Sequence, residues 1–261
     1  MIPIDLTGRR ALVTGASSGL GRAIAVAFGS AGAEVGVHFH TEEEAASTVV
    51  AEVQRAGGKA QAFGGDVSDP GAVERLFAAV DAAFGGLDIL VNNAGMDGRP
   101  AFCADSDPTM FAKTIAVDLL GPYYCARQAL KRMVPNKRGV VIQVTSVHEY
   151  IPWSGYSAYT SAKAGLSMFT KTLAQEYADR GIRVLAIAPG AIRTPINANV
   201  WQDPKGLQDL DRKVAMGRMG EPEEIGRVAA FLACDLASYI TGTTIVVDGG
   251  MLIYPDFRHG G

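Results

Sequence analysis

The sequence of 261 residues lacks several features that mark whole classes of protein. Its three cysteines, Cys103, Cys125 and Cys234, are far apart and form no CxxC pair, so we expect reduced thiols and no metal site. The 24 basic residues do not outnumber the 27 acidic ones, and the net charge of -3 favours neither nucleic acid nor a membrane surface as a partner. No apolar run reaches about 18 residues and no leader pattern stands at the start, so we expect a cytoplasmic protein.

The composition favours a single domain over residues 1–261. With 48% hydrophobic and 20% charged residues, a chain of this length can bury one large core. No repeat, low-complexity segment or linker marks a second domain.

Apolar runs and helical spacing alternate along the chain. Short apolar runs predict strands at residues 10–15, 33–39, 60–67, 87–95, 139–146, 182–190 and 243–250. The segments between them predict helices, one opened by a capping box of Thr41 and Glu44, one capped by Asp69, and one over 108–133 interrupted by a Gly-Pro pair. The alternation predicts an α/β fold, a doubly wound, Rossmann-like parallel sheet of seven strands with helices on both faces.

The segment "TGASSGLG" sets Gly15, Gly19 and Gly21 where the first strand meets the first helix. Small residues there let backbone N–H groups approach a diphosphate, and the helix dipole favours its charge. The spacing differs from G-x-G-x-x-G, and a turn needed only for tight packing is an alternative. We interpret residues 1–100 as mainly the dinucleotide-binding half.

The second strand ends in "HFHTEEE", where a fold of this kind reads the ribose of its cofactor. A protonated His40 can contact a 2′-phosphate, but three glutamates follow at once and repel one. The pattern favours NAD, or dual use of NAD and NADP. His38 we interpret as an ordinary polar residue at the strand end.

Tyr159 and Lys163 in "YTSAK" are four residues apart, so on a helix their polar ends share one face. A neighbouring ammonium favours a phenolate, which can take the proton of a hydroxyl. Ser146, at the end of the preceding strand, is placed to hydrogen-bond the same oxygen. With hydride transfer to a nicotinamide this is alcohol oxidation, or carbonyl reduction in reverse. Such a pair alone is more often an ordinary helix surface.

Five motifs in order, "TGASSGLG", "NNAG", Ser146, "YTSAK" and "PGAIRTP", make the chain resemble the short-chain dehydrogenase/reductase family over nearly its whole length. The resemblance implies that Tyr159 is the catalytic base or acid. It implies that Lys163 assists Tyr159 and binds the nicotinamide ribose, and that Ser146 positions the substrate oxygen. The implied cofactor contacts are Gly15, Ser17, Ser18, Gly19 and Leu20 at the diphosphate, Asp66 and Val67 at the adenine, Asn93 at the adenosine ribose, and Pro189, Ile192 and Thr194 around the nicotinamide.

The fourth catalytic position of that family, an asparagine, aligns with Asp118 in "IAVDLLGPYY". Its main chain can still hold a water beside Lys163, as the asparagine does in the family. Its carboxylate favours a charged Lys163 and partly offsets the pull of the ammonium on Tyr159. The alternative is that Asp118 only ends or kinks its helix.

Within the family the chain is most similar to bacterial glucose 1-dehydrogenases, through "SVHEYIPW", "PGAIRTPINAN", "GEPEEIG" and the tail "DGGMLIYPDF". This likeness implies oxidation of an aldose at its anomeric carbon to a lactone, with Ser146, His148, Asp97, Asn197 and Trp153 around the sugar. Trp153 is either a sugar platform or a core anchor. A C6-modified aldose is included, because Arg99 or Arg193 could meet an anion, although each is more often a solvated arginine.

The polar segment from Pro195 to about Val214 follows the expected nicotinamide contacts, so we expect residues 190–215 to close over substrate; a plain surface loop is the alternative. The apolar closing strand and tail predict a subunit contact, and the family resemblance implies a homotetramer. Two other functions stay open. One is an NADP-dependent carbonyl or 3-oxoacyl reductase, and the other is a non-catalytic dinucleotide-binding protein.

Overall fold

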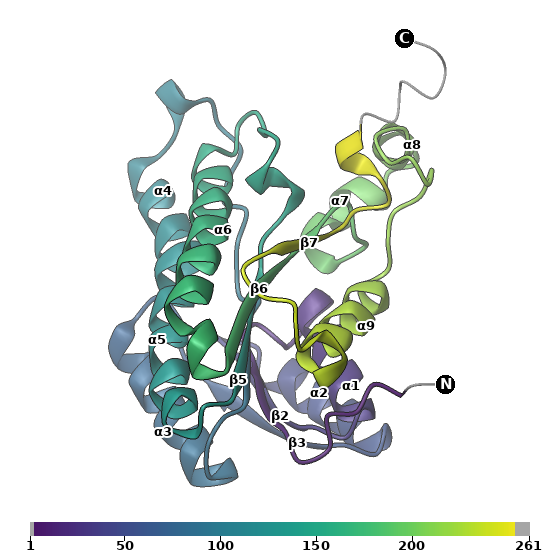
Figure 1. The fold of residues 1–261 in the computed structure, drawn as a ribbon. Helices are drawn as coiled ribbons and strands as arrows, with labels where there is room; N and C mark the ends of the chain where they lie inside the picture. The colour runs from purple at the N-terminus through teal and green to yellow at the C-terminus, as the bar shows by residue number, and fades with distance from the viewer. Residues whose placement is uncertain (1–2, 254–261) are drawn as a thin grey trace.

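A computed structural model describes residues 3–253 and contains a parallel sheet of seven strands between two helical layers (Figure 1). The strands are β1 Arg10–Val13, β2 Glu34–Phe39, β3 Lys59–Gly64, β4 Ile89–Asn92, β5 Gly139–Val144, β6 Ile182–Pro189 and β7 Thr244–Val247. Their order in the sheet is β3-β2-β1-β4-β5-β6-β7. From β1 the strands are added toward one edge of the sheet up to β3, and from β4 they are added toward the other edge. Ligands of doubly wound folds bind beyond the carboxyl ends of the strands at such a switch point. The predicted fold class is confirmed.

Helices cover both faces of the sheet (Figure 1). One layer is α1 Gly19–Ser30, α2 Glu43–Arg55 and α9 Pro222–Ala233, and the other is α3 Pro70–Phe84, α4 Pro108–Ile115, α5 Gly121–Met133 and α6 Ser157–Tyr177. Two short helices, α7 Ala198–Trp201 and α8 Pro204–Asp211, lie between β6 and α9 in the chain.

Alternate residues of each central strand enter two separate cores. In β1, Ala11 and Val13 pack with α1, α2 and α9, whereas Leu12 packs with the layer that contains α3, α5 and α6. In β4, Ile89 and Leu90 divide in the same way. Because successive strand side chains point to opposite faces, this continuous apolar sequence is what a sheet covered on both sides requires.

Local capping explains where several helices begin. Asp69 caps α3 as expected, because its Oδ1 accepts the N–H of Gly71 at 2.9 Å. The predicted capping box at Thr41 is wrong. Helix α2 begins at Glu43, and the Thr41 hydroxyl instead donates to Glu42 Oε1 at 2.8 Å.

The predicted interruption of the 108–133 helix is displaced. A π-helical stretch, Ala116–Leu120, joins α4 to α5, and the helix continues through the Gly-Pro pair. Pro122 has no N–H to donate to the carbonyl of Asp118 four residues earlier, so the helix widens ahead of the proline. Asp118 therefore lies in the widened turn.

In the part of the chain that the structure describes, no helix is both long and apolar enough to cross a bilayer. Residues 254–257, at the end of the tail "DGGMLIYPDF", lie outside the described residues.

Gly226→Ala tests the contact of α1 with α9. A Cβ at Gly226 would lie 2.6 Å from the carbonyl oxygen of Ala23. We expect the free energy of unfolding to fall by about 1–3 kcal/mol through overpacking, although alanine is the better helix former by about 1 kcal/mol. Thermal unfolding followed by circular dichroism measures the change. The control is Arg227→Ala at the exposed neighbouring position, whose free energy of unfolding should stay within about 0.5 kcal/mol of wild type. A Gly226→Ala protein as stable as that control would refute the packing argument.

Candidate active site

The predicted site residues line one cavity of about 1040 Å³ at the carboxyl edge of the sheet. Its lining includes Gly15, Ser17, Ser18, Gly19, Leu20, His40, Asp66, Val67, Asn93, Asp97, Asp118, Ser146, His148, Trp153, Tyr159, Lys163, Pro189, Ile192, Thr194 and Asn197. These residues are spread over more than half of the chain. The parallel sheet brings them together because every strand ends at the same edge.

The glycine-rich turn after β1 is a close-packed crossing of backbones. Gly15 has a φ of +60°, and a Cβ there would lie 2.8 Å from the Cα of Ala94. A Cβ on Gly21 would overlap the carbonyl oxygen of Gly15. A residue with a side chain at either place would push the turn away from its neighbours.

Asn93 and Thr14 tie the end of β4 to this turn. The Asn93 amide donates to the carbonyl oxygens of Thr14 at 2.9 Å and Gly15 at 3.0 Å. In return, the Thr14 hydroxyl oxygen accepts the N–H groups of Asn93 and Ala94. Thr14 was not among the predicted site residues, although a hydroxyl directly before the first glycine was a possible signal.

His38 is not an ordinary residue at a strand end, as the sequence suggested. Its side chain is buried with 1% exposed, and it also lines the cavity. Nδ1 accepts the N–H of Gly15 at 3.1 Å, and Nε2 lies 3.0 Å from the carbonyl oxygen of Gly65. Neither partner is near in sequence, so only the fold reveals these contacts.

The start of helix α1 fits an anionic group. The helix begins at Gly19 after Ser18, and no acidic side chain stands in its first turn. The N–H groups of a first helical turn have no partner within the helix, and the dipole places partial positive charge there. Residues 17–20 line the cavity at this point, so they fit the diphosphate of a dinucleotide.

Acidic side chains lie on the cavity wall just beyond the ends of β2 and β3. Nε2 of His40 lies 3.8 Å from Oδ2 of Asp66, and both residues are on the cavity wall with Glu42. Asp66 Oδ1 accepts both the N–H and the hydroxyl of Ser68. Two carboxylates therefore face the region where β2 ends.

Tyr159 and Lys163 lie on one face of α6, as the four-residue spacing predicted, and line the same cavity as Ser146, which follows β5. The ammonium of Lys163 donates to the carbonyl of Val144 at 3.2 Å and lies 5.4 Å from the centre of the Tyr159 ring. Ser146 Oγ accepts the N–H of His148 at 3.2 Å. The hydrogen of the Ser146 hydroxyl is left for an oxygen in the cavity.

Asp118 forms a buried ion pair with Lys163. Its Oδ2 lies 3.1 Å from Lys163 Nζ, and its Oδ1 accepts the N–H of Met96 at 2.8 Å. Burial raises the pKa of Asp118, and the ammonium partly offsets this. Burial by itself would lower the pKa of Lys163, but the charges of Asp118 and Tyr159 outweigh it and raise that pKa. The carboxylate expected to affect Lys163 therefore does contact it, and Asp118 also lies in the π-helical turn.

His148 presents a hydrogen-bond acceptor to the cavity. Its Nδ1 is 3.2 Å from the carbonyl oxygen of Ile151, which can only accept, so Nδ1 carries the proton and Nε2 is left as an acceptor. Burial lowers the pKa of His148, which favours this neutral form. The ring stacks on Trp153 at 4.6 Å between centroids and meets Tyr159 edge-on.

The other predicted substrate residues differ in what they offer. Trp153 stacks on Tyr156 at 3.7 Å as well as on His148, so it holds its loop together while 38% of it stays exposed. The carboxyl group of Asp97 is part-buried; burial raises its pKa, and the charge of Asp118 adds to this. Asn197 uses its amide within the chain, donating to Ile192 and accepting from Thr194. Its amide thus stabilises the turn and leaves little for a substrate.

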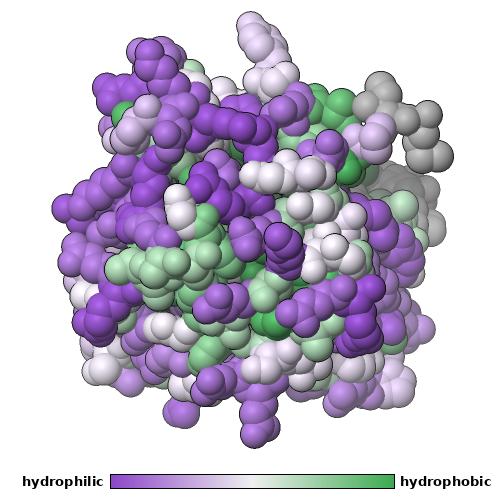
Figure 2. Space-filling view, turned by 90° about the horizontal axis from the view of Figure 1, so that it is seen from below, coloured by the Kyte–Doolittle hydropathy of each residue, from purple (hydrophilic) through white to green (hydrophobic). Residues whose placement is uncertain are grey.

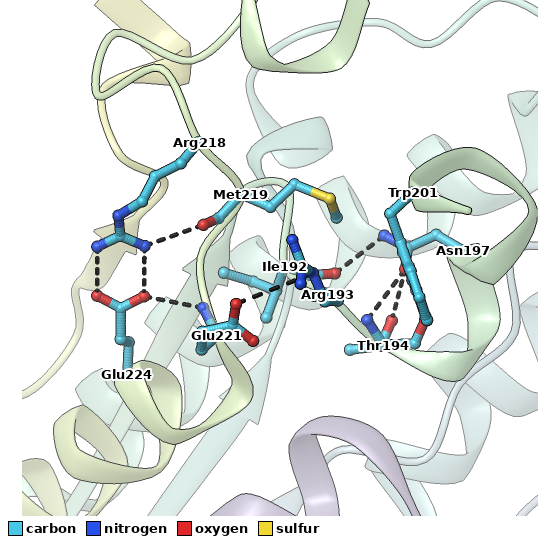
Figure 3. A network of polar contacts seen from close by, with 9 residues as sticks. All are labelled: Ile192, Arg193, Thr194, Asn197, Trp201, Arg218, Met219, Glu221 and Glu224. Carbon is cyan, nitrogen blue, oxygen red and sulfur yellow. Dashed lines mark hydrogen bonds and ion pairs between the residues drawn. The ribbon is translucent and has the colours of Figure 1, made fainter. Parts of the chain in front are cut away.

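The two ends of the segment between residues 192 and 220 are joined by main-chain hydrogen bonds. Gly220 donates its N–H to Ala191, and the N–H of Arg193 donates to Gly220, each at 2.9 Å. Trp201 Nε1 donates to the carbonyl of Thr194 at 3.0 Å. Figure 3 shows Trp201 and Thr194 on one side of Ile192 and Arg193, and the paired Arg218 and Glu224 on the other side. The intervening residues reach the cavity through Ile196, Val200, Asp209, Leu210 and Lys213.

The two arginines considered for a substrate anion do not line the cavity, within the described residues. The guanidinium of Arg193 lies over the Trp201 ring, and its Nε is 3.9 Å from Glu221 (Figure 3). Lys213 is the cation that the 192–220 segment adds to the wall. Among residues 3–253, no group of three or more His, Cys, Asp or Glu could hold a metal ion.

Comparisons with known proteins show which proteins this chain is similar to. A family model described as "Enoyl-(Acyl carrier protein) reductase" matches residues 15–252. "3beta-hydroxysteroid dehydrogenase 1" of Eggerthella lenta is 46% identical over 260 residues, which cover 98% of this chain and 98% of that protein. "Glucose 1-dehydrogenase 2" of Bacillus subtilis is 39% identical over 252 residues, 96% of this chain and 97% of that protein.

Among solved structures, a gluconate 5-dehydrogenase from Burkholderia cenocepacia, in complex with NADP and tartrate, superposes with a TM-score of 0.90. The two sequences are 30% identical, and the match covers 96% of this chain and 97% of that one.

Asp118→Asn tests what the buried carboxylate does to the reacting groups. The substitution leaves the Lys163 charge uncompensated, so the phenolate of Tyr159 becomes easier to form. We expect the acidic limb of the rate of alcohol oxidation against pH to move to lower pH by about one unit. Steady-state rates at saturating cofactor from pH 5 to 10 measure it.

Asp97→Asn is the matched control, because it removes a carboxylate from the same cavity that does not contact Lys163. It should move the limb less. An acidic limb that stays in place in Asp118→Asn, or moves to higher pH, would show that the ion pair does not govern the base.

Proposed function

Since this chain belongs to the short-chain dehydrogenase/reductase family of oxidoreductases, we propose that it oxidises the anomeric carbon of an aldose to the lactone, with Tyr159 as general base. The observation that carries the proposal is the meeting of Ser146, Tyr159 and the buried Lys163 in one cavity with a helix start fit for a diphosphate. The aldose is glucose or a C6-modified sugar.

The residues divide the reaction between them. Tyr159 takes the proton of the anomeric hydroxyl, and the Ser146 hydroxyl donates to the same oxygen as its negative charge grows. Lys163 has three N–H donors; one donates to Val144 and the ammonium is paired with Asp118, so a remaining donor could hold the cofactor ribose. When bound, the nicotinamide accepts the hydride.

The cofactor is NAD, or both NAD and NADP. The support is the pair of carboxylates, Glu42 and Asp66, on the cavity wall beyond β2, since they repel a 2′-phosphate and accept from a ribose hydroxyl. His40 beside Asp66 tempers the repulsion when protonated. The proposed nicotinamide cofactor and the three free cysteines suit an enzyme of the cytoplasm.

Two acceptors support a sugar as the substrate. His148 and Asp97 are both on the wall of the cavity, and the His148 ring meets the Tyr159 ring edge-on; His148 Nε2 and the Asp97 carboxyl group can each accept from a sugar hydroxyl. The identity with the Bacillus subtilis glucose 1-dehydrogenase over almost the whole chain adds to this support. Lys213 takes the place of Arg99 or Arg193 as the group to meet a substituent at C6.

A second candidate is oxidation of a 3β-hydroxysteroid. The higher identity with the Eggerthella lenta enzyme favours it. Apolar side chains on the same wall, those of Met96, Ile151, Ile196, Leu210 and Met251, also suit a flat apolar ring system. Reduction of a carbonyl or 3-oxoacyl group with NADPH remains the alternative direction of the same chemistry.

The segment 190–215 closes over the substrate. The support is its base, where Ile192 and Gly220 are bridged, and the side chains that it sends into the cavity. A segment pinned at one point swings as a unit, and its closure excludes water from the hydride transfer.

The chain assembles as a homotetramer. Leu120 at the end of the π-helical stretch, Tyr123 of α5, Met168 of α6 and Val246 of the edge strand β7 each stay at least 38% exposed. The face seen from below in Figure 2 also carries a group of hydrophobic side chains amid hydrophilic ones. Large exposed apolar side chains are typical of subunit contacts. Light scattering after size exclusion should give about 110 kDa, four times 27.4 kDa; a mass near a single chain would disprove the assembly.

A substrate panel tests the proposed reaction. The initial rate of nicotinamide reduction is measured with NAD and with NADP on glucose, C6-modified aldoses and 3β-hydroxysteroids. We expect an aldose to give the highest kcat/KM, with NAD at least as effective as NADP. A steroid rate well above every sugar rate would establish the second candidate, and activity confined to ketone reduction with NADPH would establish the reductase.

Tyr159→Phe is the mechanistic control. It removes the phenolic oxygen that accepts the proton and keeps the ring that contacts His148 and Trp153. Turnover should fall by about 100-fold or more, while NADH fluorescence titration should give a dissociation constant close to that of wild type. Unchanged turnover would exclude Tyr159 as the base.

A further inference from the structure

The first two N–H groups of the glycine-rich turn both point to His38. The N–H of Gly15 donates to Nδ1 of the His38 ring at 3.1 Å, and the N–H of Ala16 donates to the main-chain oxygen of His38 at 2.7 Å. Neither group is therefore directed at an anion in the cavity. The donors available to a diphosphate begin later in the turn, and their position depends on how His38 fixes its start.

The contacts of the ring define one protonation state. Gly15 offers a hydrogen, so Nδ1 must be unprotonated, whereas the Gly65 oxygen can only accept, so Nε2 must carry the proton. Burial lowers the pKa of His38 to about 4, although the contact with the Gly65 carbonyl and the charge of Asp66 oppose this in part. The ring is neutral at pH 7, as both contacts require.

The ring also connects two loops that line the cavity. Gly15 opens the turn after β1, and Gly65 directly precedes Asp66 and Val67. Gly65 lies one residue beyond β3 and its N–H donates to the carbonyl of Phe39 at 3.1 Å, so the His38 ring adds a side-chain contact to this main-chain one. A side chain on the intervening strand thus sets the spacing between two loops.

We propose that His38 is a positioning residue for the dinucleotide: its neutral Nε2–H tautomer accepts the Gly15 N–H and holds the phosphate-binding turn at a fixed distance from the Gly65–Val67 loop. This rests on the proposed function only in requiring a nicotinamide dinucleotide in the cavity. No predicted catalytic or cofactor contact included this residue.

Two substitutions separate the contact of Nδ1 with Gly15 from the contact of Nε2 with Gly65. His38→Asn places an amide oxygen as many bonds from the backbone as Nδ1, so it can still accept from Gly15 but does not reach Gly65. His38→Gln reaches as far as Nε2 and can donate to Gly65, but it leaves the buried Gly15 N–H without its acceptor. The pair thus has similar polarity and size but opposite connections.

NADH fluorescence titration measures the effect at pH 7. We expect the dissociation constant to rise about 10-fold in His38→Gln and less than about 3-fold in His38→Asn, because an unsatisfied buried N–H is costly. The loss should appear in the KM for the cofactor more than in kcat. Equal binding by the two variants, or weaker binding by His38→Asn, would overturn the proposed role of the Nδ1 contact.

Nitrogen-15 chemical shifts of the imidazole in the unmodified protein give an independent reading. We expect the Nε2–H tautomer for His38 at pH 7, and an Nδ1–H tautomer would refute the assignment even if a variant fails to fold. Absence of NADH and NADPH binding to wild type would instead overturn the proposed function, and with it any cofactor role of this residue. The two failures are therefore distinct.

Discussion

Four chain segments approach within backbone contact around Thr14 and Gly15, and the geometry of the cavity depends on that crossing. Residues from β1, β2, the end of β4 and the start of α1 all meet there. Carbonyl and N–H groups that would otherwise face water or ligand are paired across the crossing, because an unpaired buried group is costly. The turn is therefore preformed, with its start fixed and only its later N–H groups free to bind.

The catalytic side of the cavity follows another arrangement. Strand β5 ends at Val144, whose carbonyl oxygen accepts a hydrogen bond from the Lys163 ammonium. Helix α6 carries Tyr159 at the same edge of the sheet. The widened turn of the neighbouring helix brings Asp118 against that ammonium from the other side. Lys163, proposed to assist the reaction, is thus held by a main-chain atom of the sheet and by a helix irregularity, rather than by loops alone.

The sequence predicted what depends on local periodicity. Alternating strands and helices led to the parallel sheet, and a four-residue spacing placed Tyr159 beside Lys163. The sequence predicted less well which partner a polar side chain takes. Thr41 donates to the carboxylate of its neighbour Glu42 instead of capping a helix, and the Asn197 amide donates to Ile192 within its own turn. His38 gave no signal, because Gly15 and Gly65 become its partners only when the strands align.

The pairing of Lys163 with Asp118 changes the range of the electric field in the cavity. An isolated buried ammonium acts as a monopole, whose potential falls with distance and is the same in every direction. A cation with an anion 3.1 Å away acts as a dipole, so its potential falls more steeply and depends on orientation. The influence of this lysine is therefore confined to atoms that lie close to it and on the side away from Asp118.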